Sequence, residues 1–397
     1  MKIAFISDSK ENSGGSLHVT LSAARLFELW DTKNIDIDFI VTQRSVYKKL
    51  KDRYKCNFKL LDENLLAFKV SSFLYRNNFF KKIYNKFFLD NYFESFVKKN
   101  KYDLVFFITP SPLLLLCNKI NFIYSIWEFA HKEHPALSEY NENTVTNRDT
   151  YYNYACNHAY KIVLFNERSK TDFVKYYLVD NLKIEKFFFP PIVTNILIGN
   201  YSKISDLTKN KKYIFYPAQF WPHKNHIYLL ESLKKYNENR AEKFFLIFTG
   251  HDKGNLKFIK NKINNLGIMN EVIILNYISE EEICYLYKHC FAVAFPSLIG
   301  SQSLPLFESF FFQKPVMYNE KILDQFYANA TLPLNIDDYQ NLGFNIEKII
   351  NNPKLINDIV KRGFEIYRES QNENIIQTKL SRMFKKYEEY QKLSSNF

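Results

Sequence analysis

Short runs of apolar residues alternate with amphipathic, charge-bearing segments along almost the whole chain. Apolar runs of about four to eight residues between helix-length patterns are typical of strands in parallel sheets that helices cover on both faces. In the first half of the chain, the predicted strands are Lys2–Ser7, Ile35–Val41, Asp103–Thr109, Asn121–Trp127 and Lys161–Phe165. In the second half, they are Lys212–Ala218, Phe244–Thr249, Val272–Asn276, Phe291–Phe295 and Pro315–Tyr318.

The series of strands starts again near residue 212, after a polar stretch, which places a domain linker at about 192–211. We therefore predict an α/β protein with an N-terminal domain over 1–195, a second domain over 196–370 and a final helical segment over 371–397. Parallel sheets bind ligands outside the carboxyl ends of their strands, so two such domains in tandem predict an active site in a cleft between them.

Composition supports a folded protein. Of 397 residues, 46% are hydrophobic and 17% aromatic, which excludes collagen-like, disulfide-rich and disordered chains. The net charge of +12 favours an anionic partner, which could be a phosphate, an acidic membrane surface or a nucleic acid. The five cysteines are scattered without a CxxC pair, which indicates reduced thiols in a cytoplasmic protein and no zinc site.

Neither a signal peptide nor a membrane span is expected. The N-terminal apolar run is too short for a signal peptide, and the longest apolar stretch, Leu104–Cys117, is interrupted by Pro110 and Pro112.

Three loops contain residues that are candidates for ligand binding. After the first strand, Gly14 and Gly15 precede an amphipathic helix, where backbone N–H groups can approach a phosphate. The alternative is that the two glycines only allow a tight strand-to-helix turn. Lys224 stands at the opening of a helix predicted from about Ile227, suited to an anion or simply solvated. Glu308 is expected in the first turn of a helix that begins near Pro305.

A carboxylate at Glu308 can accept hydrogen bonds from two ribose hydroxyls, or it can merely favour the N-terminus of its own helix. His223 and His226 flank Lys224, but no third ligand at a suitable spacing accompanies them, so we predict no metal there.

At these residues the sequence resembles the retaining GT-B glycosyltransferases of the bacterial group 1 (family 4) class. The resemblance covers most of the chain. Its second-half stretches are YPAQFWPHKNH (216–226), FLIFTG (245–250), the run over 272–300 and LPLFESFFFQKPVMYNE (304–320). In the first half, IWEFAHKEHP (126–135), the segment 147–177 and FFFPP (187–191) are similar to one branch of that class.

The resemblance implies a GT-B fold, in which two Rossmann-like domains face each other across a cleft and C-terminal helices cross back to the N-terminal domain. It implies that Lys224 neutralises the donor diphosphate, that Glu308 holds the ribose, and that His131 lies on the acceptor side. The residues implied to bind the donor are Gly14, Gly15, Gln219, Lys224, Gly250, Gly300, Ser301, Gln302, Ser303, Leu304 and Glu308. The residues with implied catalytic roles are His131, Lys224 and Glu308.

Three positions depart from the family pattern. Gly300 replaces the first glutamate of E-x7-E, and Gln219 replaces an arginine five residues before the phosphate lysine. Glu128 replaces an aspartate and keeps its charge. We interpret these changes as altered donor handling more than as loss of activity.

The reaction that the resemblance implies needs neither a carboxylate nucleophile nor a cofactor, because the leaving diphosphate can take the acceptor's proton. Stabilisation of the charge that develops on the diphosphate is then the main task of the protein. We expect activity without a metal ion.

A basic, aromatic segment raises the question of a membrane. Phe80, Tyr84, Phe88, Tyr92 and Phe96 recur every four residues and align on one helical face. With Lys81, Lys82 and Lys86, such a helix could lie on an anionic bilayer, or it could pack into the core of the first domain.

Taken together, the sequence predicts a cytoplasmic glycosyltransferase, peripheral on the membrane in one interpretation, that moves a sugar from a nucleotide diphosphate sugar to a saccharide or lipid-linked saccharide in bacterial polysaccharide or lipopolysaccharide synthesis. The alternatives are a catalytically silent GT-B binding protein and a nucleotide-sugar epimerase. A nucleic-acid partner is not expected, because no such motif accompanies the positive charge.

Overall fold

The chain folds into two compact units. The computed structural model describes residues 1–10, 15–30, 35–62, 66, 68–70, 73, 90–189, 193, 201–276, 278–300 and 304–394. The first unit comprises Met1–Lys132, Glu142–Ile192 and Asn372–Phe397, and the second comprises Glu133–Asn141 and Val193–Gln371. The short segment Glu133–Asn141 thus belongs to the second unit although the chain on both sides of it belongs to the first.

The first unit is built on a seven-stranded sheet in the order β3-β2-β1-β4-β5-β6-β7, with every strand parallel to its neighbours. The strands are β1 (Lys2–Ser7), β2 (Asp36–Val41), β3 (Phe58–Leu60), β4 (Leu104–Phe107), β5 (Phe122–Ser125), β6 (Lys161–Leu164) and β7 (Ile184–Lys186).

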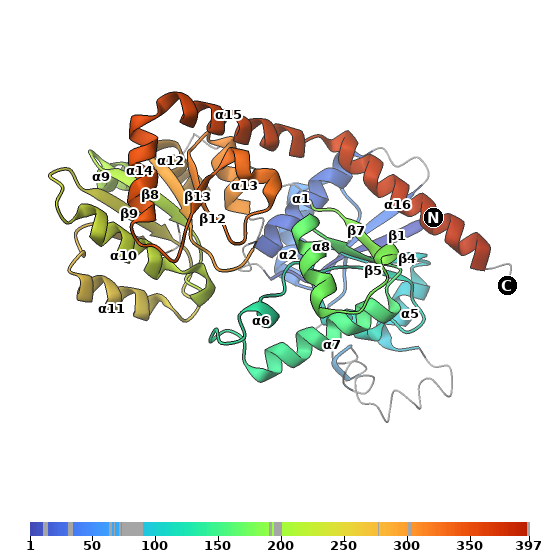
Figure 1. Cartoon of the computed structure of the whole chain (residues 1–397). Helices are drawn as coiled ribbons and strands as arrows, with labels where there is room; N and C mark the ends of the chain where they lie inside the picture. Colours follow the sequence, from blue (N-terminus) through green and yellow to red (C-terminus); the bar gives the residue numbers. More distant parts are fainter. Residues whose placement is uncertain are drawn as a thin grey trace. The chain divides into compact units, whose positions relative to one another are not determined.

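Alternate residues of β1 enter two different cores, because successive side chains of a strand point to opposite faces. Ala4 and Ile6 belong to one core, and Ile3 and Phe5 belong to the other. The described helices along this part of the chain are α1 (Gly15–Leu29), α2 (Arg44–Arg53), α5 (Tyr92–Lys99), the single turn α6 (Ala130–Glu133), α7 (Glu142–His158), α8 (Glu167–Tyr176) and, from the C-terminus, α16 (Glu373–Ser394) (Figure 1).

The C-terminal helix α16 packs into the first unit. Leu380, Met383, Phe384 and Tyr387 are buried with β1 and α1, at the spacing of three and four residues that places side chains on one helical face. The Tyr387 hydroxyl donates a hydrogen bond to the carbonyl oxygen of Asp103 at 2.7 Å.

The second unit is built on a six-stranded parallel sheet in the order β10-β9-β8-β11-β12-β13. Its strands are β8 (Lys212–Pro217), β9 (Phe244–Thr249), β10 (Val272–Leu275), β11 (Ala292–Phe295), β12 (Val316–Asn319) and β13 (Leu332–Leu334). Its helices are α9 (Ser202–Thr208), α10 (His226–Asn237), α11 (Leu256–Leu266), α12 (Glu280–His289), α13 (Leu304–Phe311), α14 (Asn341–Asn351) and α15 (Pro353–Ser370).

The predicted fold class is confirmed: both sheets are parallel and Rossmann-like, and a C-terminal helix returns to the first one. Each predicted strand is present, with ends that differ by a few residues. The sequence pattern does not predict β3, β7 and β13, which are three-residue strands at the edges of the two sheets. Such short segments have too few residues to show a period.

All five cysteines are free thiols. Burial raises the pKa of Cys56 and of Cys156 to about 11 and that of Cys290 to about 12, so these thiols stay protonated near neutral pH. No helix in the described part of the chain has both the length and the apolar content to cross a bilayer.

Candidate donor and acceptor sites

The loops that follow β8, β9 and β11 meet at the carboxyl edge of the second sheet. The strand order reverses between β8 and β11, and such a switch point is where open parallel sheets bind ligands. The Tyr216 hydroxyl joins two of these loops: it donates to the carbonyl oxygen of Lys224 at 2.8 Å and lies 2.9 Å from the Ser297 hydroxyl. The Leu298 N–H also donates to the carbonyl oxygen of His223 at 2.8 Å.

Lys224 ends a short 3₁₀ turn, Pro222–Lys224, directly before α10. Asn225, which follows it, adopts the left-handed conformation, with φ of 51° and ψ of 43°. The Lys224 side chain is partly buried, and desolvation lowers its pKa to about 8 although Glu139 acts in the opposite sense. An ammonium group that has lost hydration in this way gains from a bound anion.

Gln219 has a structural partner in this loop. Its Oε1 atom accepts a hydrogen bond from the indole Nε1 of Trp221 at 3.1 Å. Trp221 in turn stacks on the ring of His223, with ring centres 6.1 Å apart, and the Lys253 ammonium lies 5.8 Å from the Trp221 ring.

Two positions of the candidate site, Gly250 and Gly300, favour glycine for different reasons. A Cβ atom at Gly250 would lie 2.5 Å from the carbonyl oxygen of Ala218, so only glycine lets the loop after β9 approach the loop after β8 so closely. At Gly300, a Cβ atom would meet no described residue within 4 Å, but the φ of +94° disfavours a side chain. The Tyr318 hydroxyl donates to the Gly300 carbonyl oxygen at 2.6 Å.

Glu308 lies on α13, but not in its first turn as predicted. The helix begins at Leu304, which places Glu308 one turn further along. Its Oε2 atom accepts a hydrogen bond of 2.6 Å from the Tyr287 hydroxyl. Burial raises the pKa of Glu308 to about 7 against the lowering effect of that hydrogen bond. Leu304 is partly buried. Ser301, Gln302 and Ser303 lie outside the described residues.

The segment Glu133–Asn141 adds groups that the sequence pattern does not predict at this site. Nδ1 of His223 lies 2.7 and 2.9 Å from the two carboxylate oxygens of Glu139, and Nε2 of His134 lies 3.2 Å from the carbonyl oxygen of Leu298. Glu139 and His223 are 84 residues apart in sequence, and no local pattern indicates such a contact. Tyr287 was missed for the same reason.

His226 is not available as a ligand. It is fully buried, neither ring nitrogen lies in hydrogen-bond geometry with a polar atom of the described residues, and burial lowers its pKa to about 3. The ring lies against Tyr216, Phe220 and Phe248, so it acts as a neutral core residue.

In the first unit, a cluster of hydroxyl groups surrounds Asp8 at the carboxyl end of β1. The Thr42 hydroxyl donates to Oδ1 of Asp8 at 2.7 Å, and the Ser111 hydroxyl donates to Oδ2 at 2.8 Å. Gly15 is the first residue of α1, and a Cβ atom there would meet no atom of the described residues within 4 Å. Gly14 lies outside the described residues.

His131 is buried, with an exposed fraction of 1%. Its Nε2 atom lies 3.2 Å from Oδ1 of Asp149 and 3.0 Å from the Tyr177 hydroxyl, whereas Nδ1 has no hydrogen-bond partner within the part of the chain that the structure describes. Desolvation lowers the pKa of His131 despite the Asp149 carboxylate. Its role on the acceptor side stays a prediction.

Paired charges join the two first-half segments of the resemblance. Glu128 accepts a hydrogen bond from Arg148, and Asp149 accepts one of 2.6 Å from the Lys132 ammonium. These contacts hold residues 126–132 and 147–177 together within the first unit. The last three residues of the segment 126–135 belong to Glu133–Asn141 and thus to the second unit.

The predicted basic membrane surface, Lys81, Lys82 and Lys86, lies outside the described residues. Of the five aromatic residues of that stripe, the structure describes Tyr92 and Phe96. Both are partly buried on α5 and pack against a core of the first unit, as the core-packing alternative expects.

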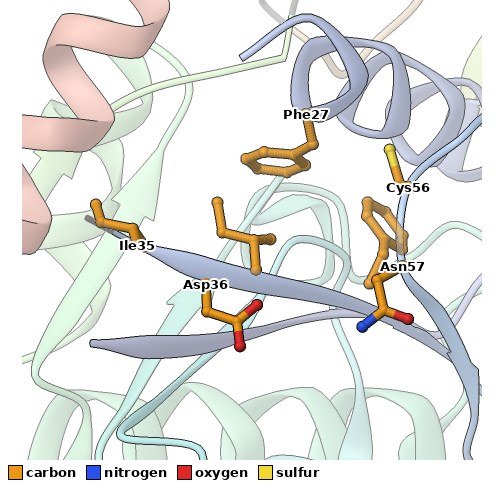
Figure 2. A pocket seen from close by; sticks show the side chains of 7 residues that line it. Phe27, Ile35, Asp36, Cys56 and Asn57 are labelled. Carbon is orange, nitrogen blue, oxygen red and sulfur yellow. The ribbon is translucent and has the colours of Figure 1, made fainter. Parts of the chain in front are cut away.

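A hollow of about 170 Å³ lies elsewhere in the first unit (Figure 2). Its lining includes Phe27, Asp36 and Cys56, and it lies near the amino end of β2. It therefore lies at the amino ends of the strands, whereas parallel sheets bind ligands with the loops at the carboxyl ends.

Comparison with known proteins identifies the second half of the chain. Residues 198–365 match the family model described as glycosyl transferases group 1. These residues are a group 1 glycosyltransferase domain. This glycosyltransferase domain contains the loops with Lys224, Gly250 and Gly300 and the helix with Glu308. No curated protein matches the chain in sequence.

Solved structures extend the similarity from the glycosyltransferase domain to both units. Alr3699/HepE from Anabaena, in complex with UDP, has a TM-score of 0.70 and 15% identity, over 97% of this chain and 100% of that one. A glycosyltransferase from Rickettsia africae has a TM-score of 0.70 and 16% identity, over 97% and 98%. The lipopolysaccharide outer core galactosyltransferase WaaB has a TM-score of 0.59 and 16% identity, over 95% and 100%. The chain therefore has the GT-B fold.

Proposed function

We propose that this protein transfers a sugar from a nucleoside diphosphate sugar to a saccharide or lipid-linked saccharide, with retention of configuration at the anomeric carbon. The observation that carries the proposal is the partly buried Lys224 ammonium at the switch point of the second sheet, inside a group 1 glycosyltransferase domain. Desolvation of this cation costs free energy that a diphosphate would offset.

The donor would bind to the loops of the second unit. Lys224 would lie against the diphosphate, Glu308 would accept hydrogen bonds from the ribose hydroxyls, and Gly300 would allow the sugar to approach the backbone. Tyr287 supports this role of Glu308, because its hydrogen bond favours the carboxylate form that accepts hydrogen bonds.

In the proposed reaction, the bond between the anomeric carbon and the β-phosphate oxygen breaks, and the acceptor oxygen forms its bond on the same face. The acceptor's hydroxyl proton passes to the leaving phosphate, which yields the nucleoside diphosphate and the glycosylated acceptor. Lys224 stabilises the charge that grows on the diphosphate, and such preorganised contacts are worth on the order of 10²–10³ in rate. We propose no metal ion in these steps.

The acceptor would bind to the first unit, near the carboxyl end of β1. The Asp8 carboxylate, oriented by Thr42 and Ser111, is suited to accept hydrogen bonds from sugar hydroxyls. WaaB, which has a similar fold, is named as a lipopolysaccharide galactosyltransferase, and this supports a role in cell-surface saccharide synthesis. Contact with an anionic membrane through Lys81, Lys82 and Lys86 stays a prediction for a lipid-linked acceptor.

Donor binding and turnover test this proposal. Thermal shifts with UDP, ADP and GDP and their sugar conjugates identify the donor, because a ligand of the folded state raises the melting temperature. Lys224→Met should abolish the shift and lower the transfer rate at least a hundredfold. The control is Lys212→Met, which removes an exposed lysine at the other end of the same strand, β8.

Transfer should persist in the presence of EDTA, and full loss there would refute the metal-independent reaction. Donor binding without product from any acceptor would instead favour a silent binding protein. Conversion of the donor without an acceptor would favour an epimerase.

A further inference from the structure

The segment Glu133–Asn141 brings a carboxylate to the loop that carries Lys224. Both oxygens of Glu139 lie within 2.9 Å of Nδ1 of His223. The two side chains are largely removed from solvent, with exposed fractions of 13% for His223 and 7% for Glu139. A poorly hydrated carboxylate at this distance stabilises an imidazolium relative to a neutral imidazole, so the pair favours a positive charge on the residue next to Lys224.

The position of His223 is fixed by further contacts. Its ring stacks on Trp221, whose indole N–H is held by Gln219, and its carbonyl oxygen accepts a hydrogen bond from the Leu298 N–H. The ring and the backbone of His223 are thus both constrained. A hydrogen-bonding side chain that is held in place before the ligand arrives loses little conformational freedom on binding, which favours affinity.

We propose that His223 is a second cationic contact to the diphosphate of the nucleotide sugar, beside Lys224, and that Glu139 is a positioning residue that keeps the imidazole protonated and oriented. The inference rests on the proposed function, since it concerns the donor site of that reaction. It makes the segment Glu133–Asn141 part of the donor site, although the sequence places it within the N-terminal half.

The same contact has an opposite interpretation with an opposite consequence. Glu139 could act as an internal anion that competes with the diphosphate for the two cations. Removal of its charge would then tighten nucleotide binding, whereas loss of a positioning carboxylate weakens it. The sign of the change in affinity therefore decides between the two.

Other titratable groups face this pair and would titrate alongside it. Lys224 and His226 interact electrostatically with Glu139 and His223, respectively. Lys253 lies over the Trp221 ring, and Glu133, His134 and Tyr140 belong to the same segment as Glu139. A pH dependence must therefore be assigned with variants of His223 itself.

The test is the affinity for UDP, ADP and GDP by isothermal titration calorimetry at about pH 7. His223→Gln and Glu139→Gln should each weaken binding of the accepted nucleotide about tenfold, the range of a charge-assisted hydrogen bond. Glu142→Gln, which removes an exposed carboxylate at the start of α7, should stay within about twofold. In the double variant, Glu139→Gln should add little to His223→Gln, because Glu139 acts through the imidazole.

A second measurement separates this role from a merely structural one. The ring proton signals of His223, followed by NMR against pH, should have a titration midpoint that falls in Glu139→Gln and rises when the nucleotide binds. Tighter binding by Glu139→Gln, or affinities of both variants within twofold of wild type, would overturn the inference while the proposed function stands. Failure of the wild-type protein to bind any nucleoside diphosphate would overturn both.

Discussion

Two residues of the candidate donor site have charge states that burial shifts in opposite directions. The pKa of Glu308 rises to about 7, and the pKa of Lys224 falls to about 8. Above about pH 7 the glutamate is ionised, and below about pH 8 the lysine is protonated. Both groups therefore carry the charge that the proposed donor binding needs only within a narrow range around neutral pH.

We predict a bell-shaped pH dependence of kcat/KM, with an acid limb near pH 7 from Glu308 and an alkaline limb near pH 8 from Lys224. In Tyr287→Phe, the carboxylate loses the hydroxyl that favours its ionised form, so the acid limb should move to higher pH. In Lys224→Arg, the alkaline limb should disappear, because arginine stays charged. Initial rates between about pH 5.5 and pH 9.5 measure both, and limbs that do not move in either variant would contradict the assignment.

At this scale, a residue's place in the fold is predictable where one loop determines it. The sequence predicts Lys224 between a strand and a helix, and the structure places it there, at the switch point; its contact with a diphosphate stays a prediction. Its partners could not be recognised, since Glu139 reaches the same loop from a segment 84 residues earlier. The side chain at Gln219 was interpreted as a lost cation, and the structure adds that it holds Trp221.

At the scale of elements, the candidate donor site is formed by loops that contact one another. The loop after β8 contacts the loop after β9 at Gly250, and hydrogen bonds from Tyr216 and Leu298 join it to the loop after β11. The strands beneath these loops were predictable from their apolar runs. The three-residue edge strands were not, because they form through pairing with one neighbour and not through a pattern of their own.

We predict that Gly250→Ala displaces the loop after β8. The new methyl group would meet backbone atoms of Ala218 and Gln219 at less than 3 Å, which only a shift of the backbone can relieve. The expected result is a loss of about 2 kcal/mol in the free energy of unfolding, with weaker nucleotide binding. Urea denaturation and calorimetric titration measure these two effects.

Gly254→Ala is the matched control for this prediction. Gly254 has a φ of +95°, and a Cβ atom there would have no neighbour within 4 Å among the residues that the structure describes. It therefore reports the cost of backbone conformation alone. Equal losses of nucleotide affinity in both variants would show that the close approach at Gly250 does not matter.

At the scale of the whole molecule, two segments belong to a different unit from the residues that precede them in the sequence. The C-terminal residues from Asn372 onward return to the first unit, and Glu133–Asn141 joins the second. The resemblance implied the first of these exchanges through the GT-B fold, and the apolar spacing of α16 supports it. The assignment of Glu133–Asn141 to the second unit has no signal in the sequence, because it reflects contacts between residues far apart in the chain, such as that between Glu139 and His223.

The packing of α16 predicts a long-range dependence of the first unit on the end of the chain. Phe384 is fully buried and its ring centre lies 6.0 Å from that of Phe5 in β1. Phe384→Ala should therefore cost about 3 kcal/mol, and hydrogen exchange should accelerate in β1 and β4. Leu393→Ala, which truncates an exposed residue of the same helix, should change stability by less than about 0.5 kcal/mol. If both variants unfold at the same urea concentration as the wild type, α16 does not stabilise the first unit.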